Sequence, residues 1–169
     1  MVKYSDIHIE DFKNLSLKSF TEVLLNDYYP FLFSELNKME DCIVNLHADY
    51  DVDILNLTHK KIVVEFDELY RKEKLVLFPY LLRLDQDNQK SENCKPFKNT
   101  KLHFTSIINH IDQALEIVSN FFLSNLNVIC LESIRLVLVE FKDNMIKLQQ
   151  IKDKHFYKNY KGCGGCQTL

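Results

Sequence analysis

Glycine is missing from nearly all of this chain. The 169 residues contain three glycines, Gly162, Gly164 and Gly165, so the first 161 residues have none. Phosphate-binding loops, G-x-G-x-x-G turns and the G-x-S-x-G elbow require glycine, and tight two-residue hairpins favour Asn-Gly or Asp-Gly. Nucleotide-binding α/β folds and hairpin-rich β folds are therefore disfavoured. Long helices joined by polar loops remain.

Composition and charge narrow the class of protein further. Hydrophobic residues are 46% and charged residues 27% of the chain, which is typical of a globular domain. The net charge of −3 argues against a nucleic-acid partner, because phosphate binding requires clustered Lys and Arg. No apolar run approaches the roughly 20 residues of a membrane-spanning helix. Five cysteines without a recognisable signal peptide predict reduced thiols and a cytoplasmic protein.

Apolar residues recur at spacings of three and four in four stretches, which predicts four amphipathic helices. The first begins at Leu17 behind a Ser16 cap, and Pro30 either kinks it or starts its second half. The stripes of the first and second stretches are Phe20, Leu24, Leu32, Leu36, Met39, Ile43 and Leu46, and then Leu55, His59, Ile62, Phe66, Leu69, Glu73, Val76 and Tyr80. Those of the third and fourth are His103, Ile107, His110, Ala114, Ile117 and Phe121, and then Leu131, Ile134, Leu138, Phe141, Met145 and Leu148.

These helices predict an all-α fold, an antiparallel up-down-up-down four-helix bundle. Polar stretches at residues 47–51, 85–99 and 124–127 are the expected loops. Residues 1–15 are expected to be a lead-in segment, residues 16–160 the bundle, and residues 161–169 a flexible tail.

One carboxylate interrupts the second stripe. Glu73 stands where an aliphatic side chain is expected, and a buried carboxylate needs a partner, a proton or a metal ion. Lys72 or Lys74 could pair with it, although adjacent residues on a helix point to different faces.

Histidines lie on or beside the stripes as well. His110 is on the third stripe, and His47 follows the stripe residue Leu46. His59 and His103 are also stripe residues, and a single stripe histidine is more often hydrogen-bonded in the core than a metal ligand. Glu73, His110 and His47 could share one level of an antiparallel bundle. The sequence alone does not require it.

Residues 65–79 are similar to a signature of hemerythrin-like domains, most of all the iron–sulfur-cluster repair di-iron proteins. That family reads E-L-x-x-H-M-x-K-E-E-x-x-L-F-P on a ligand-bearing helix, and the Lys72-Glu73 and Leu77-Phe78-Pro79 elements match it. Residues 43–47 resemble the next ligand-bearing stretch, and residues 108–112 resemble the third-helix E-H-D element. The likeness runs from about residue 16 to residue 157.

The resemblance implies a reduced set of metal ligands. A family histidine is Leu69 here, a His pair is Tyr28-Tyr29, and the fourth-helix ligand positions fall near Lys147 and Ile151. The retained positions are His47, Glu73 and His110. Two histidines and a carboxylate could bind one iron, with manganese or zinc as alternatives, and a tyrosine phenolate could add a ligand. The family link suggests handling of iron, nitric oxide or oxidative stress.

Two other interpretations stay open. The metal may have been lost, leaving a metal-free interaction or sensor module that binds a protein partner or a second copy. Alternatively the function lies in the tail, where Cys163 and Cys166 form a C-x-x-C motif that could chelate a metal or cycle between dithiol and disulfide. A plain flexible end is favoured over such a role, because a single short motif is a weak signal. No Ser or Cys lies in a recognisable activation context, which argues against nucleophilic catalysis and favours a protein that is not an enzyme, although the sequence leaves this open.

Overall fold

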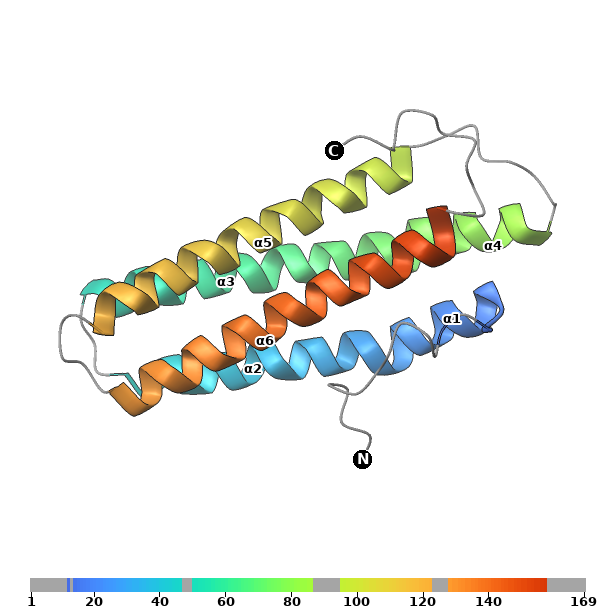
Figure 1. Ribbon diagram of the computed structural model, residues 1–169. Helices are drawn as coiled ribbons and strands as arrows, with labels where there is room; N and C mark the ends of the chain where they lie inside the picture. The colour runs from blue at the N-terminus through green and yellow to red at the C-terminus, as the bar shows by residue number, and fades with distance from the viewer. Residues whose placement is uncertain (1–11, 13, 47–49, 87–94, 123–127, 158–169) are drawn as a thin grey trace.

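The computed structural model describes residues 12, 14–46, 50–86, 95–122 and 128–157, which are almost entirely helical and contain no strand (Figure 1). The all-helical expectation is confirmed for them. They form four long helical segments. The first consists of α1 (Leu17–Val23), η3 (Leu24–Tyr28) and α2 (Tyr29–Val44), and the second of α3 (Tyr50–Lys72), η4 (Glu73–Leu77) and α4 (Phe78–Gln86). The third is α5 (Lys95–Phe122), and the fourth is α6 (Val128–Lys152) followed by η5 (Asp153–Tyr157).

The first segment begins where the sequence predicts. The Ser16 hydroxyl oxygen accepts a hydrogen bond from the Ser19 backbone N–H at 3.1 Å, which satisfies one of the free donors of the first turn. Phe12 lies upstream in the expected lead-in segment, yet it is buried and packs edge-on against Phe20. The core therefore begins before the cap.

Three π turns, the η segments, interrupt the described helices, and two of them end two residues before a proline. Pro30 follows η3 and Pro79 follows η4, each at the second position of the next α segment. A proline ring clashes with the carbonyl four residues earlier and leaves it without a donor, and the wider i→i+5 turn accommodates both effects. The expectation that Pro30 starts a second half of the first helix is confirmed.

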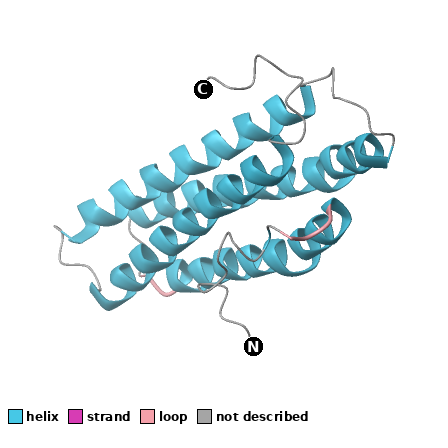
Figure 2. Cartoon of the chain, turned by 45° about the vertical axis from the view of Figure 1, so that its right-hand side comes forward, coloured by secondary structure: helices cyan, strands magenta, loops and turns pink. Residues whose placement is uncertain are grey.

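The helices are arranged as a bundle (Figure 2). Their buried apolar side chains form one core. The main contacts join α3 to α5, α2 to α6, α5 to α6, and α2 to α3. The predicted stripe of α6 is buried along its whole length, as is the predicted stripe of the first segment. No helix of the described residues is both long and apolar enough to cross a membrane.

Two predicted stripes differ from the observed buried faces at some of their positions. After Glu73 the buried positions are Leu77, Phe78 and Leu81, while Val76 is 52% exposed, so its predicted place on the stripe is wrong. The cause is η4, which lengthens one turn and delays the apolar face by one residue. In α5 the predicted stripe residues Ile107, Ala114 and Phe121 are buried, but Ile111 and Val118 are buried in place of His110 and Ile117, which lie at the edge of the apolar face.

The loop predicted over residues 85–99 is too long. Helix α4 continues to Gln86 and α5 already begins at Lys95, with Pro96 in its first turn, where its missing N–H is tolerated. Helix α3 likewise begins at Tyr50, inside the first predicted loop. The predicted tail, residues 161–169, lies outside the described residues, as do residues 47–49 and 123–127.

Candidate functional site

A buried carboxylate lies at the centre of the bundle. Glu73 is fully buried, and its Oε1 is 2.5 Å from the Nζ of Lys152, which is itself 3% exposed. Its other oxygen, Oε2, accepts a hydrogen bond from the hydroxyl of Tyr29. We call Tyr29, Glu73 and Lys152 the buried triad. Both oxygens of the carboxylate are therefore occupied by donors of the protein itself.

The triad joins three helical segments at their π turns. Tyr29 directly follows η3, Glu73 is the first residue of η4, and Lys152 directly precedes η5. Single π turns inside α-helices occur frequently at functional sites, because they re-aim side chains that a regular helix would place elsewhere. The three interruptions around one ion pair mark this level of the bundle as the candidate site.

The tyrosines at this level stay neutral. Burial raises the pKa of Tyr29 well above its ordinary value of 10.0, and the charge of Glu73 raises it further. Burial also raises the pKa of Tyr28 to about 12, and its hydroxyl donates to the Asn144 carbonyl at 3.1 Å. Both side chains therefore act as hydrogen-bond donors, Tyr28 to the Asn144 carbonyl and Tyr29 to Glu73.

Aromatic rings pack around Tyr29 of the buried triad. The ring of Tyr29 lies 5.7 Å from that of Phe66 and 5.1 Å from that of Tyr70, measured between centroids. Phe66 in turn contacts Phe33 and Phe141. An apolar wall lowers the local dielectric, which strengthens a satisfied ion pair and penalises an unpaired charge.

The residues around Glu73 do not fit a metal ion. A protonated lysine donates three hydrogen bonds and offers no lone pair, so Lys152 repels a cation from this carboxylate. Among the described residues, no three His, Cys, Asp or Glu side chains come together as a metal ion would require. His47 is one of the predicted ligands and lies outside the described residues, so the predicted three-residue ligand set stays a prediction.

His110 lies at another level of the bundle. Its Nδ1 is 3.7 Å from Oε1 of Glu65, and that oxygen accepts a hydrogen bond from the Ser106 hydroxyl at 2.8 Å. Glu65 precedes Glu73 by eight residues, or about 12 Å along a helix. The structure thus pairs His110 with Glu65 rather than with Glu73. Within the described residues, His110 Nδ1 and Glu65 Oε2 are buried atoms without a hydrogen-bond partner.

The two other stripe histidines have structural contacts. His103 contacts Lys72, and its Nε2 lies 3.9 Å from Oε2 of Glu68. His59 is 2% exposed, and its Nε2 is 3.1 Å from the Leu36 carbonyl oxygen. Because a carbonyl can only accept, this contact assigns the proton of neutral His59 to Nε2. Nδ1 is then a bare buried nitrogen, and protonating it would place a charge in the core.

We expect His59 to make the fold less stable in mild acid. Burial lowers the pKa of His59 below its ordinary value of 6.5, outweighing the opposing effects of the Leu36 carbonyl and Glu40. The unfolded chain therefore binds a proton that the folded chain does not, so stability is complete above about pH 6.5 and falls as the pH drops below it. Urea unfolding of the parent and of His59→Gln between pH 7.5 and pH 5.5 measures this. The variant should lose less stability over that range, and equal losses would contradict the assignment.

Sequence reasoning found Glu73 but missed its cationic partner. Lys72 contacts Glu68 and Lys74 contacts Tyr70, so neither of the two lysines considered for Glu73 is its partner. Lys152 continues the fourth stripe at a spacing of four from Leu148. Extending that stripe by one step would have placed a lysine in the core and suggested the pair.

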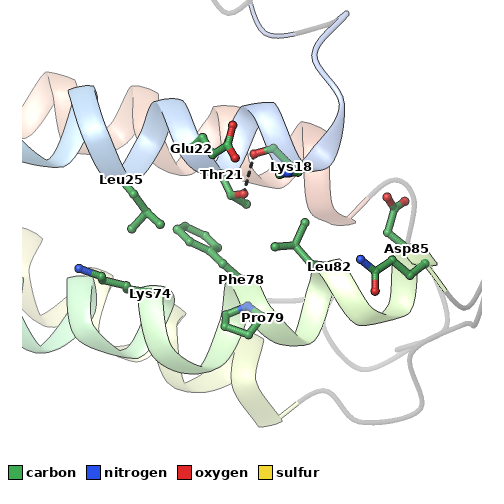
Figure 3. A pocket seen from close by; sticks show the side chains of 10 residues that line it. Lys18, Thr21, Glu22, Leu25, Lys74, Phe78, Pro79, Leu82 and Asp85 are labelled. Atoms are coloured by element: carbon green, nitrogen blue, oxygen red, sulfur yellow. Dashed lines mark hydrogen bonds between the residues drawn. The ribbon is translucent and has the colours of Figure 1, made fainter.

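A separate groove runs between α1 and α4 (Figure 3). Its volume is about 370 Å³, and Phe78 forms part of its lining. The charged residues that line it are of both signs: Lys18, Lys74, Glu22 and Asp85. This mixture gives the groove no preference for one sign of ligand charge, in contrast to the paired charges of the buried triad.

Comparison of the chain with protein-family models, with curated proteins and with solved structures found no match.

Proposed function

We propose that the chain is a metal-free four-helix bundle that works as an interaction or sensor module. In this proposal it has the up-down-up-down topology of a hemerythrin-like domain, and a lysine ammonium takes the place of a metal ion. The observation that carries it is the contact of 2.5 Å between Lys152 Nζ and Glu73 Oε1. Glu73 is the carboxylate that the sequence resemblance aligns with a ligand of the di-iron proteins.

The chemistry of the triad supports a structural role for these residues. The side chain of Glu73 is 1% exposed and that of Lys152 4% exposed, so neither group meets a dissolved substrate. Their charges cancel, and the Tyr29 hydroxyl satisfies the second carboxylate oxygen. A pair that is this completely satisfied favours one arrangement of the four helices over others.

Exposed apolar side chains support the proposed binding role. Ile129, Leu136 and Val139 on α6 are 80%, 53% and 37% exposed, and their spacing of seven and three puts them on one helix face. Leu57 and Val64 on α3 are also more than half exposed. Apolar side chains grouped on one face are typical of surfaces that bind other proteins.

Elemental analysis of purified, untagged protein tests the proposal. Cys163→Ser and Cys166→Ser are introduced first, so that the C-x-x-C motif cannot contribute metal. We expect iron, manganese and zinc each well below one equivalent, with no difference between this chain and its Glu73→Ala derivative. About one equivalent of metal that disappears with Glu73→Ala would overturn the proposal.

A second candidate function is a metal-binding protein with few ligands, as the resemblance implies. One observation favours this function. Within the described residues, His110 Nδ1 and Glu65 Oε2 are buried and have no hydrogen-bond partner. Iron would be held there by His110 with Glu65, or by the predicted set of His47, Glu73 and His110. In the same analysis, metal lost in His110→Ala and Glu65→Ala but kept in Glu73→Ala would favour the Glu65 site. Metal lost in both His110→Ala and Glu73→Ala would favour the predicted set.

A further inference from the structure

Two cysteine thiols lie near one end of the bundle, on helices that contact each other. Cys42 is in the last turn of α2, and Cys130 is in the first turn of α6. Both are free thiols and both are partly exposed. Figure 1 shows the end of α2 and the start of α6 meeting at the left of the view, and the two helices pack together.

The register between the two helices places the thiols at the same level. The Tyr28 hydroxyl reaches the Asn144 carbonyl, which fixes one level of the antiparallel pair. Cys42 follows Tyr28 by fourteen residues, and Cys130 precedes Asn144 by fourteen residues. Fourteen residues are about 21 Å of helix and close to four full turns. Starting from the contact between Tyr28 and Asn144, fourteen residues forward along α2 lead to Cys42, and fourteen residues back along α6 lead to Cys130. Because this is nearly a whole number of turns, the same sides of the two helices still face each other, and Cys42 lies opposite Cys130.

The electrostatics of the pair agree with this register. The pKa of the Cys42 thiol is raised, first by burial and then by the charge that Cys130 carries as a thiolate. A charge on one thiol influences the other only over a short distance in a solvated region. Neighbouring helices pack with their axes about 8–10 Å apart, so side chains that face each other at one level come within bonding reach after small adjustments.

We propose that Cys42 and Cys130 form a reversible dithiol–disulfide site that is oxidised by low-molecular-weight disulfides such as oxidised glutathione. The site is separate from the buried triad and does not depend on the proposed function. It uses the two described cysteines and not the C-x-x-C motif.

The reaction consists of two thiol–disulfide exchanges. The thiolate of one cysteine attacks the small disulfide, a mixed disulfide forms, and one small thiolate leaves and takes up a proton. The thiolate of the second cysteine attacks the protein sulfur of the mixed disulfide. The bond between Cys42 and Cys130 forms, and the second small thiolate leaves. Two protein sulfurs are oxidised, one small disulfide is reduced to two thiols, and the two protons pass from the protein thiols to the released thiols.

The disulfide would close a covalent loop that contains α3, α4 and α5. Cross-linking this loop, residues 42–130, restricts the unfolded chain strongly. For a chain of this length we expect the melting temperature to rise by about 10 °C on oxidation. The formation of the site is thus visible both as a chemical bond and as a change in stability.

A chain with Cys94→Ser, Cys163→Ser and Cys166→Ser tests the proposal, because only Cys42 and Cys130 remain as thiols. It is incubated with oxidised glutathione, alkylated, digested without reductant and analysed by mass spectrometry. We expect the Cys42 peptide joined to the Cys130 peptide in a monomeric chain, reversal by dithiothreitol, and the higher melting temperature. Adding Cys42→Ser or Cys130→Ser should leave one mixed disulfide and no rise in melting temperature.

Three outcomes would overturn the proposal. The first is a chain that carries a separate glutathione mixed disulfide on Cys42 and on Cys130. The second is a disulfide that forms only between two protein chains. The third is that both thiols of the two-cysteine chain remain free for alkylation, while each single-cysteine variant reacts with oxidised glutathione. Circular dichroism of the reduced chains establishes that the serine substitutions preserve the helices. If the triple substitution unfolds the chain, the same peptide map on the parent protein decides the question.

Discussion

Lys152→Met is expected to destabilise the fold by about 3–5 kcal/mol, the cost of leaving one member of a buried ion pair alone. The variant keeps an unbranched side chain that is one atom shorter and removes the ammonium that lies 2.5 Å from Glu73. The carboxylate then remains fully buried with Tyr29 as its one described hydrogen-bond donor. Urea unfolding at pH 7, followed by circular dichroism at 222 nm, measures the loss. A loss below about 1 kcal/mol would show that the pair does not form.

The double variant Glu73→Leu with Lys152→Met is the matched control. Replacing both partners of a buried pair with apolar side chains is often neutral or stabilising, so most of the lost stability should return. Glu73→Leu alone leaves a buried ammonium and should cost about as much as Lys152→Met. The free energies of unfolding of the parent, the two single variants and the double variant give a coupling energy. This coupling energy measures the interaction between the two side chains separately from the packing changes that each substitution causes. Additive effects of the two substitutions would contradict a direct interaction.

Phe66→Ala is expected to destabilise the fold by about 3–5 kcal/mol through the cavity that it leaves. Phe66 on α3 is fully buried, and its ring lies 4.8 Å from that of Phe33 and 5.5 Å from that of Phe141. It therefore joins α3 to both α2 and α6 beside the triad. For a chain of this length the melting temperature should fall by about 10 °C. Thermal unfolding by calorimetry measures this.

Val64→Ala is the control for that substitution. Val64 lies two residues away on the same helix but is 58% exposed, so its truncation should change stability by less than about 0.5 kcal/mol. Both variants shorten a side chain to alanine in the same helix, so any effect on helix propensity is shared. Similar losses in the two variants would mean that Phe66 does not pack as a core residue.

Regular stretches of helix could be predicted from the sequence alone. The α6 stripe from Leu131 to Leu148 has an uninterrupted spacing of three and four, and every member is buried. The Ser16 cap has a direct local cause in the hydroxyl that accepts from Ser19. Both features depend on interactions within one helix, which is why they can be inferred from neighbouring residues.

Features that depend on several helices could not be predicted in this way. The position of Val76 depends on η4, and the place of His110 depends on how α5 rotates against α3. The partner of Glu73 is 79 residues away in the sequence. Such a pair is specified by the register of two helices, and the sequence pattern of each helix leaves that register open. The sequence therefore identified the carboxylate of the candidate site, Glu73, but not its cationic partner, Lys152.

The π turns also affect how this chain should be aligned with other helical proteins. Each one acts in the sequence like a single inserted residue, because it rotates the downstream half of the helix relative to a regular one. Beyond Tyr28 in the first segment and beyond Leu77 in the second, an ungapped alignment with straight helices would match positions that lie about 100° apart around the helix. A gap of one residue inside each π turn restores the correspondence. Alignments that allow gaps only in loops will therefore underestimate the similarity of this chain to proteins that share its core.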